Sequence, residues 1–190
     1  VVSRAKETLE YPARFMLVAA SNPCPCGFRG HKRHPCVCTP PAVQRYLARL
    51  SGPLIDRIDI HLEVAAVDFK DWAGAPAARR AAPLETSAQV LGRVEAARAI
   101  QKRRLGREDF AVNAAIPAGE LRRHCVLDAA GLALLERLSG GGFTLSARAL
   151  DRVLRVARTI ADLAACETVR SGHLMEAVQL RGLERLSRVC

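Results

Sequence analysis

The chain has 190 residues, of which 49% are hydrophobic, so it is long enough for one ordinary domain or two small ones with real cores. Its formal net charge of +10 favours a polyanionic partner, although a basic surface that faces only solvent has the same composition. The sequence shows no secretory signal pattern and no apolar run long enough to cross a bilayer, so we expect a cytoplasmic protein without membrane segments.

The first part of the chain has the pattern of the end of an α/β domain. Residues 15–20, FMLVAA, form a short continuous apolar run, which is typical of a strand buried on both faces of a parallel sheet. Asn22 follows, at the carboxyl end where open α/β sheets bind their ligands. A Pro-Pro pair predicts the first turn of a helix over 40–50, and alternating apolar residues over 58–64 predict a half-buried strand.

The second part has a helical pattern throughout. Residues 69–84 lose periodicity and gather Gly, Pro and Ala, so we place a linker there, at 73–84. Thr86 or Ser87 is predicted to cap a long helix with a basic C-terminal end, and Ser146 the most strongly periodic helix. The remaining helices are expected around 117–125, around 128–138 and from about 171. Arg152, Arg155 and Arg158, on the polar side of the helix after Ser146, are interpreted as a solvated face.

Four of the seven cysteines lie close together, as Cys24, Cys26, Cys36 and Cys38, with the spacing C-x-C-x9-C-x-C. Four thiolates can surround one zinc ion tetrahedrally and leave no position open for water, so the pattern predicts a structural zinc knuckle at 23–39. Reduced surface thiols and a redox pair are the alternatives, and His31 or His34 could replace one cysteine as a ligand. The loop also carries Arg29, Lys32 and Arg33, which could contact DNA.

Three stretches carry a resemblance to a known family. They are YPARFMLVAASNPCPCG at 11–27, YLARLSGPLIDRIDIHLEV at 46–64 and LSARALDRVLRVARTIADL at 145–163. In this order they resemble the magnesium-chelatase-like AAA+ ATPases of the ComM (YifB) type. The resemblance implies the C-terminal part of a AAA+ P-loop α/β core with a parallel sheet at 1–72, a small four-cysteine zinc knuckle inserted in it, and an all-α lid domain at 85–190.

The resemblance also assigns roles to three residues. Asn22 resembles sensor 1, an amide that orients the attacking water near the γ-phosphate; the alternative is an Asn that starts a turn before a proline. Arg57, in Asp56-Arg57-Ile58-Asp59, resembles the arginine finger of the family's S/D-R-F-D pattern, with Ile in place of Phe. Its alternative is a surface ion pair with a neighbouring Asp. Arg148 resembles sensor 2, and with Asn22 it is expected to contact nucleotide.

The function implied by the resemblance is that of a ring-forming motor. The family suggests a hexamer that uses Mg-ATP to move on DNA, with branch migration during recombination or uptake of transforming DNA as its task. A magnesium-chelatase motor subunit acting on a protein partner is one alternative, and a non-catalytic zinc-containing nucleic-acid-binding or assembly module is another. The knuckle favours the ComM type.

One departure from the family limits this interpretation. The sequence contains no G-x-x-x-x-G-K-[ST] loop and no apolar strand ending in Asp-Glu, which are the phosphate-cradling and magnesium-holding parts of such ATPases. The chain therefore resembles a C-terminal fragment, and we expect no ATP hydrolysis by it alone. Preference for a DNA structure and direction of translocation have no signature in the sequence.

Overall fold

The computed structural model describes residues 2–4, 7–11, 15–31, 33–50, 52–64, 85–106, 111–140 and 146–181. The chain divides into two compact units, Val1–Arg49 and Leu50–Cys190. The linker predicted at 73–84 lies outside the described residues, so the division at 72 and 85 stays a prediction. In the described parts, no helix is long and apolar enough to cross a membrane.

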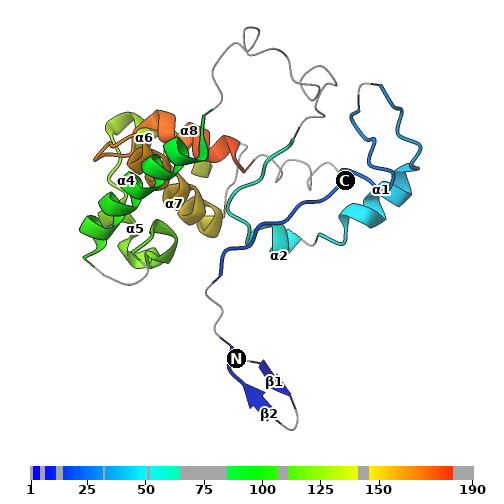
Figure 1. Cartoon of the computed structure of the whole chain (residues 1–190), viewed down its shortest axis with the longest axis horizontal. Helices are drawn as coiled ribbons and strands as arrows, with labels where there is room; N and C mark the ends of the chain where they lie inside the picture. Colours follow the sequence, from blue (N-terminus) through cyan, green and yellow to red (C-terminus); the bar gives the residue numbers. More distant parts are fainter. Residues whose placement is uncertain are drawn as a thin grey trace. The chain divides into compact units, whose positions relative to one another are not determined.

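The first unit begins with a small hairpin that the sequence analysis did not predict. Strands β1 (Val2–Arg4) and β2 (Glu7–Leu9) pair antiparallel (Figure 1). Ser3 lies opposite Thr8, and their hydroxyl oxygens are 2.9 Å apart. Each strand has three residues, too few for an apolar face that the sequence pattern would reveal.

Residues 15–20 differ from the sequence prediction. They form no strand, and their large apolar side chains are exposed, with Phe15 at 75% and Val18 at 83%. A central parallel strand exists only when strands on both sides accept and donate its backbone hydrogen bonds. The described residues contain no strand that pairs with this segment, so the predicted strand buried on both faces is wrong for the chain as it stands in this structure.

Helix α1 (Pro40–Leu47) closes the first unit and confirms the prediction from the Pro-Pro pair. Both prolines occupy the first turn, where their missing N–H groups have no partner to lose. Thr39 precedes them in an extended conformation, which is the backbone that a residue before proline favours. Val43 is the buried residue of this helix.

The second unit begins with a short helix, α2 (Gly52–Ile55), and a segment that was predicted to be a strand. Residues 58–64 form no strand; Leu62 and Val64 are exposed at 67% and 85%, and the buried residue is His61. The backbone N–H of His61 donates to the carbonyl of Leu180, 2.6 Å away, just after the last helix. The segment therefore packs against helical structure, where an alternating strand pattern has no sheet edge to join.

Residues 85–106, 111–140 and 146–181 of the second unit form a helical bundle (Figure 1). The helices described there are α4 (Ser87–Leu105), α5 (Leu121–His124), α6 (Ala129–Gly140), α7 (Ala147–Leu163) and α8 (Ser171–Gln179), with two 3-10 turns, η2 (Asn113–Ala115) and η3 (Ala118–Glu120). Thr86 and Gln89 form a reciprocal capping box before α4, and the hydroxyl of Ser146 accepts from the N–H of Ala149. Both predicted caps are confirmed.

Helix α7 is the centre of this bundle and packs against α4, α5 and α8. Its apolar residues join those of the surrounding elements in one core. The fully buried members are Val153, Ala157, Ala161, Val169, Leu174 and Ala177. Because neighbours cover α7 on several sides, the helix has little surface left for the solvated face that its arginines predicted.

The arginines of α7 correct that interpretation. Arg158 has no exposed surface, and its guanidinium donates to the carboxylate of Asp162 and to backbone carbonyls at 166–167. Arg155 donates to the carbonyl of Ile116 at 3.0 Å. The exposed arginine of this helix is Arg148, in the first turn.

Candidate functional site

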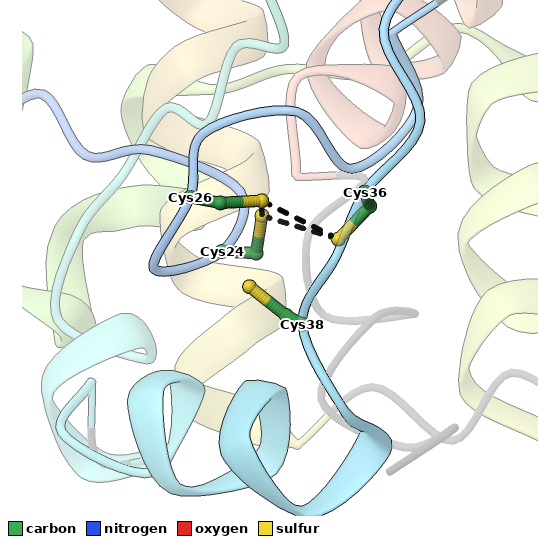
Figure 2. A group of neighbouring side chains, drawn as sticks. All are labelled: Cys24, Cys26, Cys36 and Cys38. Carbon is green, nitrogen blue, oxygen red and sulfur yellow. Dashed lines mark hydrogen bonds between the residues drawn. The ribbon is translucent and has the colours of Figure 1, made fainter.

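The four cysteines of the knuckle meet in space. Cys24 and Cys26 come from one turn and Cys36 and Cys38 from the segment that leads into α1, with their side chains pointing toward one another (Figure 2). The printed sequence separates the two pairs by nine residues, yet all four sulfur atoms lie within 4.8 Å of one another.

The sulfur separations fit a tetrahedral metal centre. The distances from Cys24 to Cys26, from Cys24 to Cys36 and from Cys26 to Cys36 are 3.4, 3.7 and 3.6 Å. Zinc–sulfur bonds of about 2.3 Å in a tetrahedron place sulfur atoms about 3.8 Å apart. The cluster therefore has the size and the donor set of a zinc site with four thiolate ligands, and no cysteine of the cluster forms a disulfide.

Local backbone geometry positions these ligands. Gly27, with φ of +83°, closes a turn in which its N–H donates to the carbonyl of Cys24, 3.0 Å away. Gly30, with φ of +82°, turns the loop a second time before Cys36. Residues other than glycine are strained at these dihedral angles, so the two glycines allow the chain to return within a short loop.

The electrostatics of the cluster favour thiolates on the first cysteine pair. Backbone N–H groups of Phe28 and Val37 lower the pKa of Cys26 to about 6. Burial acts to raise the pKa of Cys24, but hydrogen bonds from the backbone N–H groups of Arg29 and Gly27 contribute to a net lowering. The N–H of Cys26 acts to lower the pKa of Cys38, yet burial and the neighbouring sulfurs raise it to about 12. Thiolates this close repel one another, and a bound divalent cation is the charge that relieves the repulsion.

The histidines of the loop are not part of the sulfur cluster. Nδ1 of His31 accepts hydrogen bonds from the backbone N–H groups of Arg33 and His34, each at 3.1 Å. The rings of His31, His34 and Phe28 instead contact one another, with centroids 5.0 to 5.8 Å apart. Among the described residues, the group that could hold a metal ion consists of the four cysteines.

We expect the purified chain to bind about one zinc ion per molecule through this cluster. Replacing Cys24 and Cys26 by Ser should abolish the stoichiometric zinc while leaving the helical circular-dichroism signal of the bundle in place, because the knuckle and the bundle lie in separate compact units. Elemental mass spectrometry of protein prepared without chelators measures the metal. Cys166→Ser, outside the cluster, is the matched control and should keep its zinc. Parent protein with no metal and four freely titratable thiols would contradict the assignment.

Asn22 lies immediately before the knuckle, and its side chain is exposed. It follows the irregular segment 15–20, and Pro23 comes next. The structure therefore places the predicted sensor-1 residue at the end of the segment from which it was predicted to project. Its role toward nucleotide stays a prediction.

Arg57 lies in the turn that ends α2, and its guanidinium is exposed. Nη1 donates to the carbonyl of Pro53, 2.7 Å away, which directs the side chain back along the short helix. The two aspartates beside it pair with other arginines: Asp59 with Arg152 of α7, and Asp56 with Arg181 at 3.9 Å. No described carboxylate forms a salt bridge with Arg57, so the alternative of a local ion pair has no support in the structure.

Arg148 occupies the second position of α7, directly after the capping residue Ser146 and Ala147. Its exposed guanidinium lies near the N-terminal end of the helix dipole, which disfavours a cation there. One turn later on the same helix, Nη1 of Arg152 donates to the backbone carbonyl of Arg57 at 2.8 Å. The structure thus links the helix of Arg148 to the turn of Arg57, a contact that the sequence analysis missed.

Comparison with known proteins gives the class first. The family model described as magnesium chelatase, subunit ChlI, matches residues 1–72, and the one described as magnesium chelatase, subunit ChlI C-terminal, matches residues 84–181. The chain therefore belongs to the magnesium-chelatase ChlI family, which implies a AAA+-related fold.

Individual relatives refine this to the ComM type. YifB of Escherichia coli is 40% identical over 187 residues, which is 97% of this chain and 34% of that protein. YifB of Salmonella typhimurium gives the same identity and coverage. The competence protein ComM of Haemophilus influenzae is 38% identical over 98% of this chain and 34% of its own length. The chain is thus a ComM-type, magnesium-chelatase-like sequence that spans about a third of these relatives.

Proposed function

We propose that this chain supplies the sensor-1, arginine-finger and lid portions of a ring-forming motor that hydrolyses Mg-ATP and moves on DNA. The observation that carries the proposal is the state of the Arg57 turn. Both neighbouring aspartates are engaged by arginines of the helical unit, while the Arg57 guanidinium stays exposed. The guanidinium of Arg57 is always charged, and no described carboxylate pairs with it. An arginine held in this way at a turn can stabilise negative charge on a phosphate bound by a neighbouring subunit.

The other roles follow from position. Asn22 orients the attacking water, and Arg148 contacts the γ-phosphate from the first turn of α7 within its own subunit. Arg57 acts across the subunit interface, which requires a ring; the family resemblance makes it a hexamer. This chain contains no phosphate loop and covers 34% of YifB, so we infer that the loop and the magnesium-holding acid lie in another part of the full-length protein.

The assignment of DNA as the partner rests on charge and on similarity. Residues 11–55 contain six Lys and Arg and no Asp or Glu. The knuckle therefore lies in a stretch of sequence whose Lys and Arg charges no Asp or Glu offsets. Such a stretch attracts a polyanion at long range. The similarity to a protein named for competence, a process of DNA uptake, points to DNA as that polyanion and to branch migration as the task.

The function is tested on a full-length form that joins this chain to a phosphate-loop half. ATP turnover should require Mg²⁺ and rise when branched or single-stranded DNA is added, and strands of a synthetic junction should separate only while ATP is hydrolysed. ATP turnover that does not change when DNA is added, but rises with a magnesium-chelatase protein partner, would favour the magnesium-chelatase motor subunit. No nucleotide binding at all would favour a non-catalytic zinc module.

We predict that the knuckle loop binds DNA phosphates. Arg29 and Arg33 are exposed, and replacing both by Ala in the full-length form should weaken DNA binding uniformly across sequences. The slope of log K against log salt should fall by about one for each phosphate-binding arginine that is removed. Filter binding or fluorescence anisotropy between low and physiological salt measures it.

The matched control removes two charges elsewhere. Arg122 and Arg123, exposed on α5, are replaced by Ala, which changes the net charge equally. This control should leave the salt slope near that of the parent. Equal salt slopes in the parent and both variants would contradict the prediction that the knuckle binds DNA phosphates.

A further inference from the structure

Among the contacts of the described residues, the side chain of Arg152 binds the turn that carries Arg57 to α7. Nη1 of Arg152 donates to the backbone carbonyl of Arg57 at 2.8 Å and to the carboxylate of Asp59. Arg152 is mostly buried, with 18% of its side chain exposed. One guanidinium nitrogen therefore holds both the residue that carries the finger and the acid two residues after it.

The C-terminal end of α8 holds the same segment from another side. Nη1 of Arg181 donates to the carbonyl of Ile58 at 3.2 Å, and the carbonyl of Leu180 accepts from the N–H of His61. These contacts fix the backbone of 56–61, so the position of the Arg57 Cα is set by the helical unit. The guanidinium of Arg57 itself is bound only to the carbonyl of Pro53 among the described contacts.

Arg148 and Arg152 lie one helical turn apart on α7, where residues at i and i+4 share a face. An α-helix with a packed core moves as a rigid body, so a displacement at its first turn reaches the next turn undiminished. The helix thus connects a residue predicted to contact the subunit's own nucleotide with the turn that presents the finger.

We propose that Arg152 is a positioning residue that couples the two nucleotide sites of a subunit: closure of the lid on its own ATP, through Arg148, moves α7, and Arg152 carries the Arg57 turn with it into the site of the neighbouring subunit. This inference rests on the proposed function. It adds a residue that touches no nucleotide and a direction of communication, from a subunit's own site to its neighbour's.

The test is a set of variants in the full-length form. Arg152→Ala should lower the turnover number by on the order of 10²-fold, as expected when a catalytic group is misplaced by about an ångström, while ATP affinity and KM stay near the parent values. Because Arg152 acts through Arg57, the double variant Arg57→Ala/Arg152→Ala should turn over no more slowly than Arg57→Ala alone. Arg152→Lys, which keeps a cation opposite Asp59, should restore part of the loss.

A structural role is separated by a matched control. Arg155 lies on the same helix, is partly buried and donates to the carbonyl of Ile116. Arg155→Ala should lower thermal stability about as much as Arg152→Ala does, yet change turnover far less. If Arg152→Ala rings do not assemble, Arg152→Met, which keeps a long side chain but has no donor for the Arg57 carbonyl and no charge, replaces it in the same comparison.

Two outcomes overturn the inference while leaving the proposed function intact. One is normal turnover by assembled Arg152→Ala or Arg152→Met rings when Arg57→Ala rings are slow. The other is a double variant that is slower than Arg57→Ala by the full factor of the Arg152 change, since independent effects multiply. If instead Arg57→Ala itself leaves turnover unchanged, the finger assignment fails, and with it the proposed function.

Discussion

Replacement of Arg57 by Ala is expected to lower ATP turnover by on the order of 10³-fold in the full-length form, as for other arginine fingers. ATP affinity should stay close to that of the parent, because the side chain serves the site of the neighbouring subunit. Nη1 of the exposed guanidinium donates one hydrogen bond to the carbonyl of Pro53, and it can exchange this bond for one to a phosphate at small cost. Turnover and nucleotide-binding assays on the same preparation separate the two quantities.

Mixed rings decide whether the effect acts between subunits. Arg57→Ala subunits are combined with subunits that lack the phosphate-loop Lys, so some interfaces pair one intact loop with one intact finger and regain activity. Arg57→Lys is the conservative control, and it should recover only part of the loss because an ammonium cannot form the two-pronged contact of a guanidinium. A mixture that stays inactive although both variants form rings would contradict a finger acting in trans.

The helices of the bundle were predictable because their signals are local. Thr86 and Ser146 were identified as caps from residue type and position, and both accept the expected backbone N–H. The cysteine cluster was also predictable from the spacing of its four residues. What the spacing could not give is the differing pKa values of the four thiols.

The predicted strands could not be confirmed because a strand depends on partners. Residues 15–20 and 58–64 have strand-like patterns, but the chain covers only 34% of the length of YifB and ComM, and the described residues provide no sheet for them. Their apolar side chains are correspondingly exposed in this structure. The apolar pattern therefore identifies segments that are suited to a sheet. Whether they form strands depends on neighbouring strands with which they can pair.

The contacts of the arginines were the main feature that sequence reasoning missed. Arg152 donates a hydrogen bond to the carbonyl of Arg57, which is 95 positions earlier in the sequence, and Arg181 donates one to the carbonyl of Ile58, which is 123 positions earlier. No local pattern reports such pairs. The Arg158–Asp162 pair is local, but its i, i+4 spacing is the usual spacing of a solvent-exposed helix pair, so burial could not be read from it.

Asp162 is the centre of a buried polar network between α7, α4 and η2. Its carboxylate accepts from Arg104 at 2.7 and 2.5 Å, from Arg158 at 3.0 Å and from the amide of Asn113 at 2.8 Å. Neither Asp162 nor Arg158 has exposed side-chain surface. The carboxylate thus pairs with two guanidinium groups, that of Arg158, which is fully buried, and that of Arg104, which is 18% exposed.

Replacing Asp162 by Ala should therefore lower the free energy of unfolding of the helical unit by about 3–5 kcal/mol, because removing one partner leaves buried cations without compensation. Asp162→Asn, which keeps one acceptor oxygen but loses the charge and the second acceptor, should fall between this variant and the parent. Urea unfolding of the whole chain, followed by the helical circular-dichroism signal, measures the change. Asp151→Ala, on the same helix but outside the network, should stay within about 1 kcal/mol of the parent. An Asp162→Ala chain that unfolds at the parent urea concentration would mean that water reaches Arg104 and Arg158 and that the network does not stabilise the bundle.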